Sequence, residues 1–151
     1  MLFNVSGLIQ DGIGATRRHV LSAELPRENG QAEHVEGTVE LLRTRAGVLV
    51  RADLIMQEFE ICSRCLKPLE ETAAIRFEEE FQSTVDFKTG APLAGPADPD
   101  VFLIDAHHIL DLTEAVRQYR EAATDMQPLC RPDCRGLCPD CGSDLNQGDC
   151  G

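Results

Sequence analysis

The C-terminal sequence CRPDCRGLCPDCGSDLNQGDC, residues 130–150, holds five cysteines within 21 residues. A segment this short buries too little apolar surface to fold alone, so we expect cross-links to order it. A metal site, a disulfide knot and a redox centre are the three chemistries that use thiols at this density. The three predict different kinds of protein, and the cellular compartment and the cysteine spacing help to separate them.

The compartment argues against disulfides. The N-terminal sequence MLFNVSGLIQDGIG lacks the basic and long apolar segments of a secretory signal, and no run of 18 apolar residues occurs. We therefore expect a cytoplasmic protein without membrane contact. Cytoplasmic thiols are kept reduced, which favours metal ligands over disulfides.

The spacing of the cysteines favours zinc. Cys138 and Cys141 are separated by two residues and followed by a glycine, which lets both thiolates reach one tetrahedral ion. Cys130 and Cys134 form a second pair with a three-residue gap. We predict that these two pairs hold one zinc ion, which would supply most of the folding energy of the segment. An iron–sulfur cluster and unliganded thiols are alternatives, and Cys150 has no assigned role.

A further pair, Cys62 and Cys65, lies at the predicted end of a strand and before Lys67-Pro68. This pair could complete a split zinc ribbon with Cys138 and Cys141, bind a metal of its own weakly, act as a redox pair or form a turn with two half-buried thiols. Redox pairs usually lie at a helix N-terminus that lowers the thiol pKa. A strand end therefore makes the redox role the weaker alternative.

The middle of the chain alternates between apolar and polar residues, which predicts a β-rich fold. Three segments, near residues 35–42, 48–56 and 69–82, each place apolar side chains on one face. A turn around Gly47 joins the first two, so we expect an antiparallel sheet with one buried face. The acidic run Glu78-Glu79-Glu80 falls on such a strand and is interpreted as solvated rather than catalytic.

One helix is predicted over residues 111–126, after a proline-rich loop over 89–100 and a short buried strand over 101–105. Asp111 and Glu114 have the spacing of a capping box. The apolar residues recur at helical spacing and would pack on the sheet: Leu112, Val116, Tyr119, Ala123 and Met126. His107 and His108, just before the helix, are interpreted as structural.

These patterns predict an α+β, β-rich protein: an antiparallel sheet of long strands, one docked helix and a C-terminal zinc knuckle. The expected domain organisation is a body over residues 1–127 and a cysteine-rich knuckle over residues 128–151. The formal net charge of −12 disfavours strong, non-specific binding to nucleic acid. Contact with a basic protein partner agrees better with this charge.

The sequence also resembles a known family. The stretches ICSRCLKPLE (residues 61–70), DLTE at the helix start and PLCRPDCRGLCPDCGSDLN (residues 128–146) are similar, in order and spacing, to the YceD family of large ribosomal RNA subunit accumulation proteins. The resemblance implies a non-enzymatic factor that supports synthesis, processing or accumulation of large-subunit rRNA. It implies ribosomal proteins or rRNA-processing factors as partners, and no small-molecule substrate.

Two hypotheses follow for the function. In the first, a zinc-stapled β domain binds a ribosomal or rRNA-processing partner, and Arg131 and Arg135 on the predicted zinc loops make local contacts with RNA. In the second, the protein is a thiol redox or redox-sensing protein that uses Cys62 and Cys65.

Overall fold

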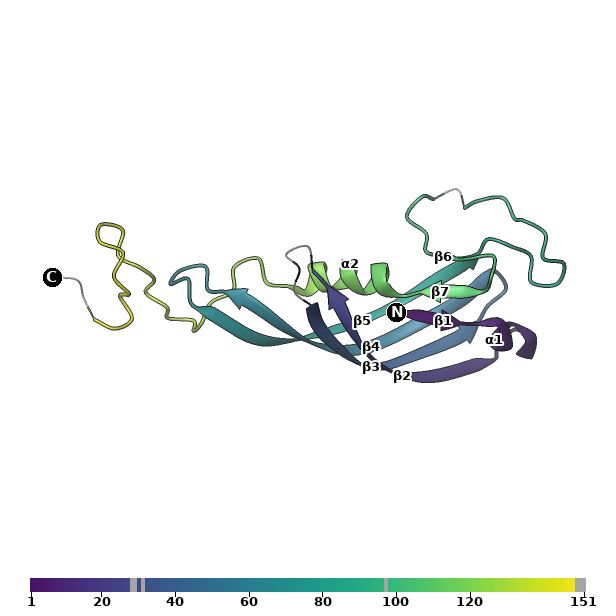
Figure 1. The fold of residues 1–151 in the computed structure, drawn as a ribbon, viewed down its shortest axis with the longest axis horizontal. Helices are drawn as coiled ribbons and strands as arrows, with labels where there is room; N and C mark the ends of the chain where they lie inside the picture. The colour runs from purple at the N-terminus through teal and green to yellow at the C-terminus, as the bar shows by residue number, and fades with distance from the viewer. Residues whose placement is uncertain (28–29, 31, 97, 149–151) are drawn as a thin grey trace.

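The computed structural model describes residues 1–27, 30, 32–96 and 98–148 (Figure 1). Its elements in chain order are β1 Leu2–Asn4, α1 Ser6–Asp11, β2 Thr16–Pro26, β3 Ala32–Arg43, β4 Gly47–Ile61, β5 Pro68–Ser83, β6 Leu103–Ile104, β7 Ile109–Asp111 and α2 Thr113–Ala123. The strands form one seven-stranded sheet in the order β1-β7-β6-β5-β4-β3-β2.

The predicted β-rich architecture is confirmed, but the sheet is mixed rather than antiparallel. Strands β2 to β5 form an antiparallel meander, as expected from the alternating sequence. Strand β6 pairs with β5 in parallel. The long connection over residues 84–102 returns the chain to the end of β5 from which it left. Strand β6 therefore pairs with Gln82 and Ser83, the last residues of β5, and runs in the same direction.

The three predicted strands correspond to β3, β4 and β5, and their apolar faces are buried as expected. Val39 on β3, Leu54 on β4 and Ile75 on β5 are each no more than 1% exposed. Prolonged alternation with period two identifies such strands well, because only one face of the sheet is covered.

No pattern above assigns an element to residues 1–34, yet β2 covers eleven of them and forms the sheet edge. Its alternation is incomplete, since Leu21 and Leu25 are buried whereas Val20 is 84% exposed. An edge strand packs against one neighbour only, so its sequence carries a weaker signal.

The predicted helix is present, docked and shorter than expected. Helix α2 begins at Thr113 and ends at Ala123, and no side chain caps its N-terminus. The capping-box prediction is wrong because Asp111 belongs to β7, where its carboxylate accepts hydrogen bonds from the N–H and hydroxyl of Thr113. Glu114 contacts Arg117 and Gln118 instead.

Helix α2 lies along one face of the sheet, above β5 and β4 (Figure 1). Leu112 and Val116 are fully buried, and the Tyr119 ring stacks on Phe77 of β5 with 4.6 Å between centroids. The expected apolar stripe stops there, since Ala123 is exposed and Met126 is 96% exposed. None of the described helices is long and apolar enough to cross a membrane.

The β4–β5 hairpin extends beyond its neighbours. Pairing between β3 and β4 reaches Val35 and Met56, whereas β4 and β5 remain paired up to Ile61 and Pro68. Figure 1 shows the C-terminal segment beside this projecting end of the hairpin. The fold thereby brings two distant cysteine-containing segments to one place.

Candidate metal centre

Four thiols gather where the hairpin meets the C-terminal segment. The sulfur atoms of Cys62, Cys65, Cys130 and Cys134 all lie within 4.8 Å of one another. The Sγ–Sγ distance is 3.8 Å for Cys62 and Cys134, and 3.5 Å for Cys65 and Cys130. Four sulfurs at about 2.3 Å from a tetrahedral zinc ion would be about 3.8 Å apart, whereas a disulfide requires about 2 Å. The arrangement therefore fits a four-thiolate metal site.

The first pair of thiols is positioned by the turn of the β4–β5 hairpin. The Cys62 N–H donates to the Lys67 carbonyl at 2.8 Å, and the Leu66 N–H donates to the Cys62 carbonyl at 3.0 Å. Leu66 adopts a φ of 60°, a left-handed conformation that is uncommon for a side chain of this kind. The tight turn points both thiols inward, and Cys62 is completely buried.

The turn at Cys138 has the same hydrogen-bond pattern. The Cys138 N–H donates to the Ser143 carbonyl at 2.8 Å, and the Gly142 N–H donates to the Cys138 carbonyl at 2.9 Å. Gly142 takes the left-handed position, with a φ of 75°, that Leu66 takes in the hairpin. The chain therefore contains two turns of equivalent geometry.

The structure places only two of the four ligands predicted from spacing in the thiol group. Cys130 and Cys134 join Cys62 and Cys65, whereas Cys138 and Cys141 do not belong to this group. A cage shared with Cys62 and Cys65 was an alternative above, but with Cys138 and Cys141 as the partners. Cys138 is buried, and the Cys141 sulfur lies 3.1 Å from the Ser143 hydroxyl. Cys150 lies outside the described residues. The signal for the first pair was present in the sequence, but only the fold shows which cysteines it meets.

The electrostatics of the group reflect four thiols in contact. Backbone N–H groups of Cys65, Cys130 and Arg64 donate to the Cys62 sulfur and lower its pKa to about 6. Contact with the Cys65 thiol, followed by burial, raises the pKa of Cys130 to about 12. One thiolate is thus stabilised while its neighbour stays protonated, because a second negative charge so close is unfavourable. A divalent cation would remove this repulsion and release the remaining protons.

Polar contacts join the two segments around the thiols. The Arg64 guanidinium donates to the Cys134 carbonyl at 2.9 Å, and the Ser63 N–H donates to the Pro128 carbonyl at 2.9 Å. Lys67 forms a 2.6 Å ion pair with Asp144. The hairpin turn therefore contacts the C-terminal segment at Pro128, Cys134 and Asp144.

The two arginines proposed for RNA contact lie on this segment and are exposed. The Arg131 guanidinium donates to the Asn146 side chain at 2.9 Å, and the backbone N–H of Arg135 donates to the same oxygen at 2.9 Å. The Asn146 side-chain amide in turn lies 3.5 Å from the Cys134 sulfur. Asn146 therefore links both arginines to the thiol group.

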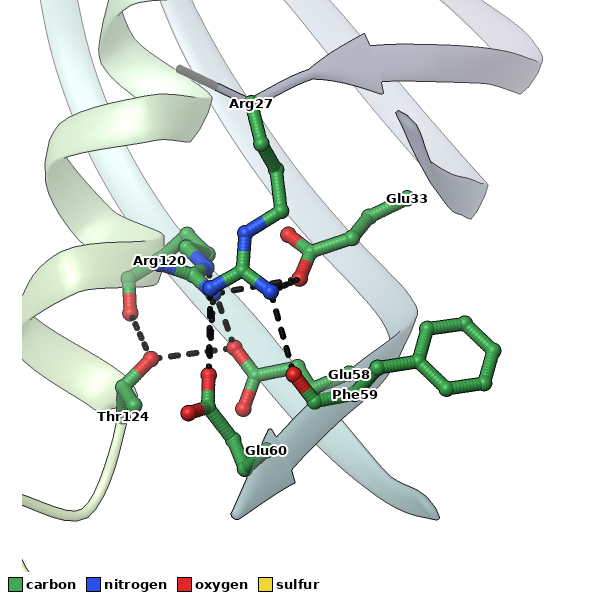
Figure 2. A network of polar contacts seen from close by, with 7 residues as sticks. All are labelled: Arg27, Glu33, Glu58, Phe59, Glu60, Arg120 and Thr124. Atoms are coloured by element: carbon green, nitrogen blue, oxygen red, sulfur yellow. Dashed lines mark hydrogen bonds and ion pairs between the residues drawn. The ribbon is translucent and has the colours of Figure 1, made fainter. Parts of the chain in front are cut away.

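A largely buried network of ion pairs joins the elements that lead to the thiol group (Figure 2). Arg120 of α2 pairs with Glu33, Glu58 and Glu60 at 3.1, 3.2 and 3.3 Å. Arg27, the residue after β2, also pairs with Glu33 and Glu60. The network connects the end of α2 with β3 and with the distal part of β4. The chain continues from α2 to Cys130 and from β4 to Cys62. Sequence patterns did not reveal it, because its five charged residues come from three distant parts of the chain.

We expect the Lys67 contact to control the titration of Asp144. Lys67 is the main reason that the pKa of Asp144 falls from 3.8 to about 2, with help from the N–H of Asn146. Because the folded pKa is lower, the contact stabilises the segment above about pH 3.8, and its contribution is lost as the pH falls through 2.

In the Lys67→Met variant, the Asp144 carboxyl should therefore titrate at higher pH, closer to 3.8. Carboxyl-carbon NMR during an acid titration measures this shift. Lys88→Met, on the distant loop, serves as the matched control and should leave Asp144 unchanged. An unchanged Asp144 titration in Lys67→Met would show that the ion pair does not form in solution.

The fold and the thiol group together define a small β-rich protein with a candidate structural metal centre that joins two distant segments of the chain. The sequence profile of the family described as "Large ribosomal RNA subunit accumulation protein YceD" matches residues 59–151, which include all four thiols of the group. The chain belongs to this family.

The curated relatives with significant similarity include the uncharacterized proteins Rv2926c of Mycobacterium tuberculosis (strain ATCC 25618 / H37Rv) and Mb2951c of Mycobacterium bovis (strain ATCC BAA-935 / AF2122/97). Each is 30% identical over 102 residues, which cover 66% of this chain and 45% of the relative. The chain thus spans less than half the length of these proteins. No solved structure matches it significantly.

Proposed function

We propose that the protein is a non-enzymatic factor that supports the synthesis, processing or accumulation of large-subunit rRNA. The family match over residues 59–151 carries this proposal. The family description names the accumulation of an RNA and no reaction. The matched region contains the projecting hairpin end, helix α2 and the thiol group, so the proposal rests on this part of the chain.

Within this role, the thiol group of Cys62, Cys65, Cys130 and Cys134 would hold a structural zinc ion. The sulfur spacing and the all-thiolate donor set support zinc. Four ligands from protein leave no open position for a substrate, which is typical of structural sites. The set predicted from spacing, with Cys138 and Cys141 in place of Cys62 and Cys65, is the competing assignment.

A redox role has one observation in its favour, the pKa of about 6 for Cys62. A thiolate formed at neutral pH is a nucleophile, but it also needs access to its substrate. Cys62 is completely buried and Cys65 is only 5% exposed. A buried pair in contact with two further thiols fits metal binding better than exchange with a disulfide substrate.

The partner we propose is a ribosomal protein or an rRNA-processing factor in the cytoplasm. A chain of net charge −12 attracts basic proteins and repels phosphate at long range. RNA contact would then be local and would involve Arg131 and Arg135. Both are exposed and lie on the segment that the thiol group would anchor. We further propose that residues 128–151 act as a knuckle attached to a body over residues 1–127.

Depletion of the protein tests the proposed function. We expect large-subunit rRNA to fall relative to small-subunit rRNA, and large subunits to decline in sucrose-gradient profiles. Wild-type protein should restore both, whereas a Cys62→Ser/Cys134→Ser variant should not. An unchanged ratio of the two rRNAs after full depletion would exclude the proposal.

A further inference from the structure

The outer face of the sheet, opposite α2, consists of two chemically different halves. In the half nearer to α1, charged residues on neighbouring strands neutralise one another. Arg18 pairs with Glu40 at 3.2 Å, and Arg76 pairs with Asp53 at 3.1 Å. Arg51 pairs with Glu40 and Glu78. This half is electrostatically balanced within the chain.

The half toward the projecting hairpin end carries three exposed apolar residues on β4, with Gln57 between them on the same face. Ile55, Phe59 and Ile61 of β4 are 47%, 49% and 59% exposed. Residues between them on β4, such as Met56 and Glu58, are buried on the α2 side, so the three side chains share the outer face. Figure 2 shows the Phe59 ring pointing away from the ionic network. We call Ile55, Phe59 and Ile61 the apolar strip.

The strands beside the strip carry acidic residues. The register places Glu36 opposite Ile55 and Glu70 opposite Phe59, while Ser22, the partner of Glu36, is two residues from Glu24. Among the described residues, no lysine or arginine pairs with Glu24, Glu36 or Glu70.

The only ion-pair partner of Glu24 and Glu36 in the described part of the chain is His34, at 2.9 and 3.7 Å. A hollow of about 330 Å³ lies between this acidic edge and the strip, lined by His34, Glu36, Ile55, Gln57 and Thr72. Apolar surface, carboxylates that pair with no lysine or arginine of the described residues, and a hollow large enough for a side chain thus lie together.

From this combination we infer that the apolar strip and its acidic edge bind a basic, amphipathic segment of a partner protein. Its apolar residues would cover Ile55 and Phe59, and its lysines or arginines would pair with Glu24 and Glu36. An RNA would bring phosphates against these carboxylates, and a second copy of the chain would bring a like-charged edge. The carboxylates disfavour both occupants. The assignment of the partner as ribosomal rests on the proposed function. The inference that the partner segment is basic and amphipathic rests on the surface alone.

Site-specific photo-crosslinking tests this inference in the full-length chain. The photoreactive amino acid p-benzoylphenylalanine is placed at Phe59 in one strain, at Ile55 in a second, and at Ile13 in a control strain. Ile13 is 68% exposed and lies just after α1, at the other end of the molecule. We expect positions 55 and 59, but not 13, to crosslink to the same protein, through a peptide with both basic and apolar residues.

Charge removal provides the second measurement. With the crosslinker at 59, the Glu24→Gln/Glu36→Gln variant should lower the crosslink yield several-fold, and added salt should lower it in the unmodified chain. Asp140→Asn, an exposed residue of the C-terminal segment, is the matched control and should not change the yield. Circular dichroism confirms that each variant is folded.

Several outcomes would overturn the inference: crosslinks to RNA, crosslinks only to a second copy of the chain, no crosslink beyond that at position 13, or a yield insensitive to the glutamates. The proposed function is judged separately by the rRNA ratio after depletion. If the crosslinked basic protein is unrelated to ribosomes, the inferred binding surface stands but its partner is not ribosomal.

Discussion

Serine in place of Cys62 or Cys134 is expected to abolish tight zinc binding and to release the C-terminal segment from the hairpin. Both thiols are buried within the group, and three thiolates bind the ion far less well than four. Structural zinc sites contribute about 10–16 kcal/mol in small zinc-binding peptides, so most of the order of this segment would depend on the ion. Metal content by mass spectrometry and limited proteolysis after residue 127 measure the two effects.

The matched control is Cys138→Ser, which changes a buried cysteine of the same segment outside the thiol group. We expect this variant to retain one zinc ion per chain. The opposite pattern, with zinc lost in Cys138→Ser and kept in Cys62→Ser, would establish the ligand set predicted from spacing. X-ray absorption at the zinc edge would show four sulfur ligands in either case, so only the variants separate the two sets.

Replacement of Arg120 by methionine should destabilise the fold by about 3–5 kcal/mol, the cost of breaking a buried ion pair by removing one partner. The side chains of Glu33 and Glu58 are 1% and 5% exposed, and they would lose the cation that lies between them. Arg27 contacts Glu33 and Glu60, so Glu58 would lose its only arginine in the described network. Urea unfolding followed by circular dichroism measures the change.

Arg117→Met is the matched control, because Arg117 lies on the same helix but pairs with the exposed Glu114 and Glu121. Surface pairs of this kind contribute about 0.3–0.5 kcal/mol, so the control should be nearly neutral. Adding Glu33→Gln and Glu58→Gln to Arg120→Met should restore part of the lost stability by removing the buried charges. Equal losses in Arg120→Met and Arg117→Met would contradict this view of the network.

The central sheet was predictable because three consecutive strands bury one face each. Alternation over many residues leaves no competing interpretation for Val35–Leu42 or for the segment that becomes β5. The short strands β1 and β7 gave no such signal, and β6 was indicated only as the short buried strand predicted over residues 101–105. Their pairing depends on chain direction after the loop over residues 84–102, which local patterns do not encode, and the parallel β5–β6 pair was therefore missed.

The candidate site was predictable as chemistry but only partly as geometry. Cysteine spacing indicates which thiols are able to share an ion, and Cys138 with Cys141 does form the expected tight turn. An equivalent turn at Cys62 and Cys65 competes for Cys130 and Cys134, however, and is brought to them by the length of the β4–β5 hairpin. Proximity in sequence favoured Cys138 and Cys141 as the partners of Cys130 and Cys134, whereas the fold places Cys62 and Cys65 beside them.

The ligands of the thiol group are far apart in the chain, since Cys65 and Cys130 are separated by 65 positions. An ion bound there would close a covalent loop that contains β5, β6, β7 and α2. Closing a long loop restricts the unfolded chain, so the ion would stabilise the sheet and helix as well as the tail. Such a contact also forms late, because Cys134 is synthesised after the hairpin and must meet it over a large separation in sequence. Zinc occupancy would then report that the β4–β5 hairpin and the elements within the loop, and not only the tail, have reached the native fold.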